Sequence, residues 1–239
     1  MMKLVVQALL FDVQGTATDF HSTVCDEARR ISAGRHPGVD WPDVVRRWRA
    51  GYFTTLKAAQ GRGGGWVSVH TVYRDALDAV LDEHGVSELS DTEREELTLA
   101  WRRLRPWPDV VPGLTRLKSA FTLATLSNAD VSAVINISKR AGLPWDAIFA
   151  AEMAGVFKPD PAIYRMAATY LGLDHAEIMM VASHKYDIRA AGDLGFRTAF
   201  VARPLEFGVG GEADVAYSDE FDINAADFLD LADQLMARL

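Results

Sequence analysis

Short apolar runs alternate with helical patterns along most of this chain of 239 residues, and no other feature restricts its fold as strongly. The runs typical of buried strands are Leu4–Phe11, Thr122–Leu126, Ile178–Ala182 and Thr198–Val201, with shorter candidates at Ile148–Ala150 and near Asp214–Ala216. The helical patterns between and after them are Val131–Arg140, Pro161–Leu171, Ile188–Leu194 and Ala225–Leu239. Strands that alternate with helices form parallel sheets, so the pattern predicts an α/β fold with a doubly wound, Rossmann-like core.

The stretch from Phe20 to Arg105 differs from the rest because it is helical throughout and holds no convincing strand. Its signals in chain order are a helix start at Asp40 and Pro42, a break at Gly61–Gly65, a second repeat over Trp66–His84, and a capping box of Ser90 and Glu93 that opens a helix through Leu104. We expect residues 20–105 to form a cap over a core of residues 1–19 and 106–239. An insert at this point can cover the crevice of the sheet and exclude water.

The overall composition excludes several classes of protein. The formal net charge is -8, with no run of Lys or Arg long enough for nucleic acid or an anionic membrane surface. No segment approaches the roughly 20 apolar residues of a membrane span, and the first residues do not resemble a signal peptide. A single cysteine, Cys25, rules out an internal disulfide and fits a reducing cytoplasm. Cys25 could be a nucleophile, but the pattern around it favours a buried helical residue.

Polar residues follow the predicted strands at the points where those strands end. Asp12 follows the first run, Ser127 and Asn128 follow the second, and Asp187 comes shortly after Ile178–Ala182. Lys158 precedes a helix nearby in the predicted fold. Because the carboxyl ends of parallel strands meet at one edge, these side chains are expected to converge there. A single Asp at a strand end is often only a turn or capping residue, but a set with complementary chemistry indicates an active site.

This set resembles the motifs of the haloacid dehalogenase superfamily, and the resemblance spans nearly the whole chain. Asp12 matches the nucleophile of the first motif, Ser127 and Asn128 match the second, Lys158 the third and Asp187 the acidic end of the fourth. The helical insert lies where many members carry a cap. The resemblance implies an α/β hydrolase with an aspartate nucleophile.

Two departures from the common pattern select a branch. Most members are magnesium-dependent phosphatases with a second Asp two residues after the nucleophile, where this chain has Gln14, and a metal-binding Asp in the fourth motif, where it has Ser183. Losing carboxylates weakens a site for a hard cation. The chain therefore resembles the 2-haloacid dehalogenases, which need neither cofactor nor metal, although those usually have an aromatic residue in place of Gln14. The alternatives are a magnesium-dependent phosphatase, a phosphonate-cleaving relative and a non-catalytic binding protein.

The resemblance implies an in-line displacement by a carboxylate. Asp12 would attack the carbon that bears the halogen, and water would then hydrolyse the resulting ester. Lys158 would keep Asp12 ionised, while Asp187, helped by Asn128, would activate the water. The remaining roles fall to Thr16 and Ser127 at the substrate carboxylate, Gln14 at the pocket floor, and Arg49 at the leaving halide, with Arg46 as its rival.

His184 and Tyr186 stand where the family usually has a small amide or an aromatic residue. We expect them to line the halide site, where charge-assisted hydrogen bonds would help a basic leaving group such as fluoride. The predicted substrates are therefore small 2-haloacids, with fluoroacetate beside chloroacetate. Trp41, Trp48, Trp66 and Tyr52 give the cap an aromatic bias, mostly as packing. A homodimer is possible, but no residue pattern predicts it.

Overall fold

The computed structural model describes residues 6–61, 66–86 and 88–239 of the chain. Its main sheet has six strands in the order β5-β4-β1-β6-β7-β8, and every neighbouring pair is parallel. The strands are β1 (Ala8–Phe11), β4 (Thr122–Ser127), β5 (Ala147–Ala150), β6 (Ile178–Ala182), β7 (Arg197–Val201) and β8 (Ile223–Ala225). The predicted α/β fold with a doubly wound parallel sheet is confirmed.

Strand β1 lies at the centre of the sheet, between β4 and β6. All its residues are fully buried, as expected for a strand with helices on both faces. The chain runs from β1 to β4 and β5 on one side, then returns to β6 on the other. This reversal opens a crevice at the carboxyl end of β1, where doubly wound proteins bind their ligands. Asp12 is the first residue after that end.

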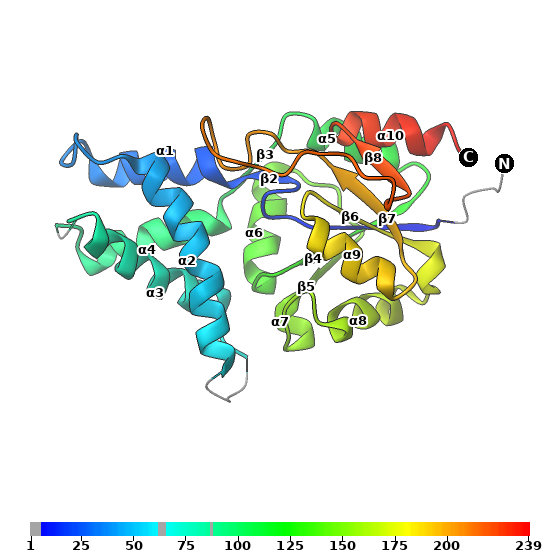
Figure 1. Cartoon of the computed structure of the whole chain (residues 1–239), viewed down its shortest axis with the longest axis horizontal. Coiled ribbons are helices and arrows are strands. Elements are labelled where there is room, and N and C mark those ends of the chain that lie inside the picture. The colour runs from blue at the N-terminus through cyan, green and yellow to red at the C-terminus, as the bar shows by residue number, and fades with distance from the viewer. Residues whose placement is uncertain (1–5, 62–65, 87) are drawn as a thin grey trace.

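Helices cover both faces of the sheet (Figure 1). Helices α5 and α10 pack against each other on one face, and α8 and α9 lie together on the other. The crossing of α5 and α10 is very close at Gly113, where an added Cβ would lie 2.7 Å from the backbone oxygen of Phe228. The core helices are α5 (Val110–Leu117), α6 (Val131–Ala141), α7 (Ala151–Ala154), α8 (Pro161–Leu171), the short η2 (His175–Glu177), α9 (Lys185–Asp193) and α10 (Phe228–Met236).

A second group of helices stands beside the sheet, on the left in Figure 1. These are α1 (Phe20–Ser32), α2 (Trp41–Gly61), α3 (Val69–Glu83), α4 (Asp91–Thr98) and the short η1 (Leu99–Arg102). The capping box of Ser90 and Glu93 at the start of α4 is present as predicted. A two-stranded ribbon joins this group, the cap, to the rest: β2 (Thr18–Asp19) pairs antiparallel with β3 (Arg105–Pro106). None of the helices in the described ranges is both long and apolar enough to cross a bilayer.

The structure corrects several predicted elements. No strand forms near Asp214–Ala216, because the Asp214 carboxylate accepts a hydrogen bond from Ala216 N at 3.3 Å and pairs with Lys185; the edge strand is β8 instead. The last helix starts at Phe228 rather than Ala225, since Asp227 caps it.

Two corrections fall in the cap. Helix α3 starts at Val69 rather than Trp66, after the cap residue Ser68. Arg105, at the end of the segment predicted to be free of strands, lies in β3. The start of the predicted first strand, Leu4–Val5, and most of the Gly61–Gly65 break fall outside the described residues.

One core carboxylate fastens the cap to the core. Asp130, in the turn before α6, accepts hydrogen bonds from Val69 N at 2.9 Å, from His70 N at 3.0 Å and from Ser68 Oγ at 2.9 Å. It therefore satisfies free N–H groups at the start of α3. Because the donors belong to the cap and the acceptor to the core, this contact holds the cap against the carboxyl edge of the sheet.

Candidate active site

Asp12 lies at the centre of a buried ionic cluster. Its residue is only 5% exposed, and its backbone N–H donates to Val181 O at 3.0 Å, which continues the β1–β6 pairing. Oδ1 accepts from Lys158 Nζ at 2.9 Å, while Oδ2 accepts from Thr16 Oγ1 at 2.7 Å and lies 3.3 Å from His184 Nδ1. Burial alone would raise the pKa of Asp12, but Lys158, His184 and Thr16 together hold it well below its usual range. The carboxylate is therefore ionised and has the charge that a nucleophile needs.

Lys158 bridges the two acidic residues of the cluster. Its side chain is 1% exposed, and Nζ donates to both Asp12 and Asp187. Burial opposes its charge, but the two carboxylates outweigh that and raise the pKa of Lys158. Asn128 holds the lysine backbone: Lys158 N donates to Asn128 Oδ1 at 2.7 Å, and Asn128 Nδ2 donates to Lys158 O at 3.1 Å. The Asn128 amide therefore bonds the backbone of Lys158, whereas the sequence predicted that it assists Asp187.

Asp187 lies in the first turn of α9 and is fully buried. One carboxylate oxygen accepts from Lys158, and the other accepts from Tyr164 Oη at 2.6 Å. Burial is the main reason that the pKa of Asp187 is raised, with the negative charge of Asp12 adding to it and Lys158 opposing it. A carboxylate whose proton affinity is raised is suited to act as a base. The sequence prediction missed Tyr164, which looks like one more apolar residue on the buried face of α8.

Arg49 approaches the site from the cap. The residue is 7% exposed, and Nη1 donates to Tyr73 Oη at 2.6 Å. Its guanidinium carbon also lies 5.0–5.8 Å from the centres of four aromatic rings, those of Phe20, Tyr52, Phe53 and Trp101. We call these four rings the aromatic cage.

Within the described ranges, no carboxylate lies close enough to Arg49 to form an ion pair with it. The rival residue differs in this respect, because Arg46 pairs with Asp43 and its side chain is 28% exposed. Of the two arginines that the sequence left open, the structure brings Arg49 to the interface of cap and core.

Gln14 connects the cap to the first loop of the core. Its Oε1 accepts from Tyr73 Oη at 3.0 Å and from Arg49 Nη1 at a longer 3.5 Å. Burial, opposed by Arg49, raises the pKa of Tyr73 to about 12, so the phenol remains a donor. Tyr73 was expected only as part of the apolar repeat of its helix, and its hydroxyl is a site feature that the pattern could not reveal.

Thr16 and Ser127 both lie in the site, but with different surroundings. The Thr16 hydroxyl donates to Asp12, lies 3.0 Å from Ser183 Oγ and accepts from Ser183 N at 2.9 Å. The Thr16 hydroxyl therefore connects Asp12 to the loop that carries Ser183. Ser127 Oγ is fully buried and has no hydrogen-bond partner among the residues described. The hydroxyl at the end of β4 therefore keeps unused hydrogen-bonding capacity.

His184 lies between two carboxylates. Besides its contact with Asp12, its Nε2 lies 2.7 Å from Oε1 of Glu206. Tyr186 stands beside it, with ring centres 5.9 Å apart, and is 43% exposed. The sequence predicted that both residues face the leaving halide, but the structure turns Nδ1 of His184 toward Asp12. Glu206 was not predicted, because the loop that carries it has no regular pattern.

The acidic residues do not fit a divalent cation. Among the residues that the structure describes, no group of three or more His, Cys, Asp or Glu side chains is placed to hold a metal ion. Asp12 and Asp187 both bond the Lys158 ammonium, which neutralises the charge that would attract such a cation. Gln14 and Ser183 are uncharged and engaged elsewhere.

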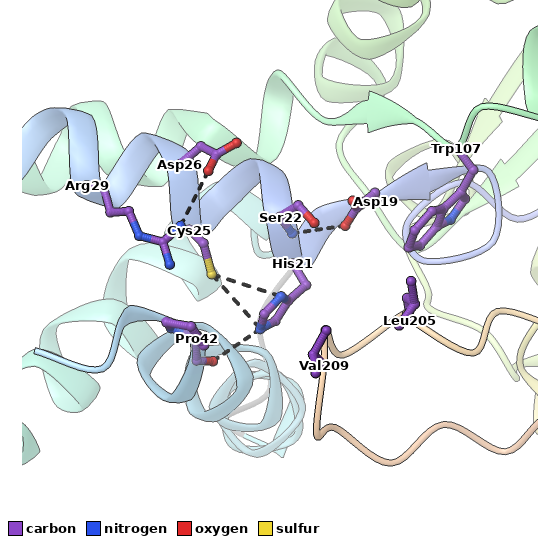
Figure 2. Close-up of a pocket in the computed structure, with 11 residues that line it drawn as sticks. Asp19, His21, Ser22, Cys25, Asp26, Arg29, Pro42, Trp107, Leu205 and Val209 are labelled. Carbon is purple, nitrogen blue, oxygen red and sulfur yellow. Dashed lines mark hydrogen bonds and ion pairs between the residues drawn. The ribbon is translucent and has the colours of Figure 1, made fainter.

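A separate hollow of about 370 Å³ lies between the cap and the loop after β7 (Figure 2). His21 and Cys25 from α1 line one wall, and Leu205 and Val209 line the other. Burial raises the pKa of the Cys25 thiol to about 12, so it stays protonated. This supports the expectation that Cys25 is a buried helical residue rather than a nucleophile.

Comparison with known proteins agrees with this geometry. The family model of haloacid dehalogenase-like hydrolases matches residues 6–195. An (S)-2-haloacid dehalogenase of Pseudomonas sp. (strain YL) is 31% identical over 203 residues, which cover 83% of each chain. The defluorinating L-2-haloacid dehalogenase Rha0230 superposes with a TM-score of 0.91 at 37% identity, covering 97% of this chain and 95% of that one.

A further solved structure is the L-2-haloacid dehalogenase of Xanthobacter autotrophicus with chloropropionic acid covalently bound. It superposes with a TM-score of 0.79 at 27% identity, covering 97% of this chain and 98% of that one. The fold, the ionised aspartate after β1 and these similarities together place the chain among the haloacid dehalogenase-like hydrolases.

Proposed function

We propose that this enzyme hydrolyses the carbon–halogen bond of short 2-haloalkanoic acids, such as chloroacetate, to give 2-hydroxy acids. The observation that carries the proposal is that one site contains two buried charges of opposite sign. Asp12 is ionised on the core side, and Arg49 lies on the cap side without a carboxylate partner within the described ranges. The first supplies a nucleophile, and the second supplies a positive charge for an anion that forms in the site. The dehalogenase names of the relatives point to the same chemistry.

The first step is an in-line displacement. An oxygen of Asp12 attacks the carbon that bears the halogen, a carbon–oxygen bond forms, and the halide leaves with the bonding electron pair. Lys158 keeps Asp12 ionised until it reacts. The halide then meets the Arg49 guanidinium, which the aromatic cage shields from water, so that its attraction for an anion is strengthened.

The second step releases the product. Water attacks the carbonyl carbon of the Asp12 ester, and Asp187 accepts a proton from that water. The bond between Cγ and the ester oxygen breaks, and the 2-hydroxy acid leaves with a proton on its new hydroxyl. Asp12 ionises again, so one halide and one proton are released in each cycle. Tyr164 orients Asp187 for this task.

We place the substrate carboxylate near Ser127. The buried Ser127 hydroxyl lacks a partner in the described structure and lies at the end of β4, the strand next to β1. Gln14 and Tyr73 close the pocket on the cap side. Large side chains around Arg49 leave little room, which favours acids of two or three carbons.

We further propose that the reaction needs no metal ion and that fluoroacetate is a substrate. The metal-free chemistry is supported by Lys158, which balances both acidic residues. Fluoride is the most basic halide and gains most from a charged donor such as Arg49. The defluorinating relative, at 37% identity, supports the same choice. A homodimer and a cytoplasmic location remain predictions. Size-exclusion chromatography would test the first, and cell fractionation would test the second.

The proposal is tested by ion-selective detection of halide released from chloroacetate, 2-chloropropionate and fluoroacetate in the presence of a chelator. Asp12→Asn is the inactive control, and a phosphate-ester assay with magnesium runs in parallel. We expect halide release that survives chelation and disappears in the variant. Magnesium-dependent phosphate release without halide release would overturn the proposal in favour of a phosphatase.

A further inference from the structure

His184 is held by carboxylates at both ring nitrogens. Nδ1 lies 3.3 Å from Asp12 Oδ2, and Nε2 lies 2.7 Å from Glu206 Oε1. Burial opposes a charged ring, but Glu206 and Asp12 outweigh it and raise the pKa of His184 to about 10. The ring is therefore an imidazolium at neutral pH, with an N–H pointing at each carboxylate.

Glu206 is buried, and the backbone around it leaves space for its side chain. The residue is 4% exposed, although it lies on the loop after β7. Gly15, with φ +92°, makes room for it, because an added Cβ there would lie 2.4 Å from Glu206 Oε1 and 3.3 Å from His184 Cε1.

Arg203 anchors the start of the Glu206 loop. It donates to Thr16 O at 2.7 Å and forms two bonds to Asp109, at 2.9 and 2.8 Å. The first-motif loop and the Glu206 loop are thus shaped to meet at His184.

The position of Nδ1 decides which step it can serve. In an in-line displacement the halide leaves on the side of the carbon opposite the attacking oxygen. A donor 3.3 Å from Asp12 Oδ2 is therefore on the nucleophile's side, whereas Arg49 approaches from the cap. Oδ2 also accepts from Thr16, so this oxygen has two donors, while Oδ1 bonds Lys158.

We propose that Glu206 is a positioning residue that orients His184 so that its Nδ1–H, together with the Thr16 hydroxyl, stabilises the charge on Asp12 Oδ2 during hydrolysis of the ester. The inference rests on the proposed function. Oδ1 forms the bond to the substrate, and Oδ2 becomes the carbonyl oxygen of the ester. When water adds to Cγ, the carbonyl electron pair moves to Oδ2, and the two fixed donors face it there. When the pair returns, the bond from Cγ to the ester oxygen breaks.

The test separates the two steps by rapid quench with chloroacetate. Enzyme in excess over substrate gives the rate of halide release and the rate of 2-hydroxy acid formation, and mass spectrometry follows the ester on Asp12. Glu206→Gln keeps the size of the side chain and removes its charge. We expect hydrolysis to slow by about 10- to 100-fold, halide release to change by less than about threefold, and the ester to accumulate.

Two controls isolate the action through His184. Asp214→Asn removes an exposed carboxylate further along the same segment, where it pairs with Lys185 at 2.7 Å, and should change neither rate. In a double-mutant cycle, Glu206→Gln should add little to His184→Gln, because the glutamate acts through the ring. A nuclear magnetic resonance titration of His184, whose other charged neighbour is Asp12, should show its pKa falling in Glu206→Gln.

The outcomes have distinct meanings. Equal slowing of halide release and hydrolysis without ester accumulation would overturn the proposal, as would a loss confined to halide release, which would return His184 to the leaving halide. An unfolded Glu206→Gln variant would move the test to Glu206→Asp, whose shortened carboxylate should give the same selective defect. If the wild type releases no halide, the proposed function fails, whereas the titration still shows whether Glu206 controls the ring.

Discussion

The two sides of the site hold their charges in different ways. On the core side, Asp12, Asp187, Lys158 and His184 form direct ion pairs with one another. On the cap side, Arg49 has a phenol and the aromatic cage as neighbours and no carboxylate within reach in the described structure. On the core side, which we call the matched side, both cations, Lys158 and His184, form direct ion pairs with carboxylates, Glu206 included. The cap side presents one buried cation, Arg49, that forms no ion pair in the described structure, and we call it the unmatched charge.

This difference assigns the two sides different tasks. A buried ion pair fixes geometry and protonation state, which is what a nucleophile and its base require. A buried cation without a counter-ion is unfavourable unless an anion arrives to balance it. In the proposed reaction the core side prepares the attack, and the cap side is suited to receive the halide that the attack would produce.

The largest expected effect comes from breaking the matched side at its centre. Asp12→Asn removes the proposed nucleophile while keeping the shape of the side chain, so we expect halide release from chloroacetate to fall by at least about 1,000-fold. A coupled halide assay under chelator measures this, with melting temperature as the control for folding. Substantial remaining activity would mean that another group attacks the carbon.

The next effect comes from removing the unmatched charge. Arg49→Met keeps an apolar side chain in the aromatic cage but removes the cation, and we expect a loss of about 100-fold in kcat/KM. Arg46→Met is the matched control on the same helix, and its pairing with Asp43 lies outside the site. Rate measurements on chloroacetate and fluoroacetate compare the two, and an equal loss in both variants would remove Arg49 from the halide site.

The matched side should also appear in the pH dependence of stability. The raised pKa of His184 means that its contribution is fully present below 6.5 and is lost as the pH rises through about 10. The lowered pKa of Asp12 has the opposite sign, so its contribution is lost as the pH falls below 3.8.

Urea unfolding of the wild type and His184→Gln tests the alkaline limb. Their difference in unfolding free energy should shrink as the pH rises from 6.5 to 10, by at most about 1.4 kcal/mol per pH unit. A difference that stays constant across this window would show that the ring is not charged in the folded protein.

The smallest effect comes from loosening the contact between the two sides. Asp130→Ala removes the acceptor for three donors at the start of α3. Loss of these hydrogen bonds at the start of α3 should lower the free energy of unfolding by about 1 kcal/mol. We expect KM for chloroacetate to rise by about fivefold, with a smaller change in kcat. Steady-state kinetics measure this, and Asp227→Ala, which removes the N-cap of the core helix α10, is the control. A larger fall in kcat than rise in KM would assign Asp130 a role in catalysis.

The sequence predicted the sheet, and it predicted that Asp12, Ser127 and Asp187 converge at the carboxyl edge of that sheet, whereas the orientation of His184 was not predicted. Asp12 and Ser127 stand where apolar runs stop, Asp187 lies in the helix that follows β6, and parallel strands bring such ends to one edge. The position of the edge strand along the chain was not predictable, because the turn at Asp214 depends on an ion pair with Lys185 of helix α9.

The partners that complete the site were harder to find. Tyr73 and Tyr164 lie on the buried faces of helices, where a tyrosine looks like any apolar residue until its hydroxyl meets a partner. Glu206 lies on a loop without periodicity, and only the three-dimensional meeting of Gly15, His184 and Arg203 places it. Residues that act through long-range contacts carry no local signal.

The most direct test of the account is a single turnover in water enriched in the heavy oxygen isotope, with enzyme in excess over chloroacetate. If Asp12 forms the ester, the first 2-hydroxy acid carries the original oxygen of Asp12, and the peptide that contains Asp12 gains one heavy oxygen. Heavy oxygen in the product of that first turnover, with none in the peptide, would show that water attacks the carbon directly and would contradict the account.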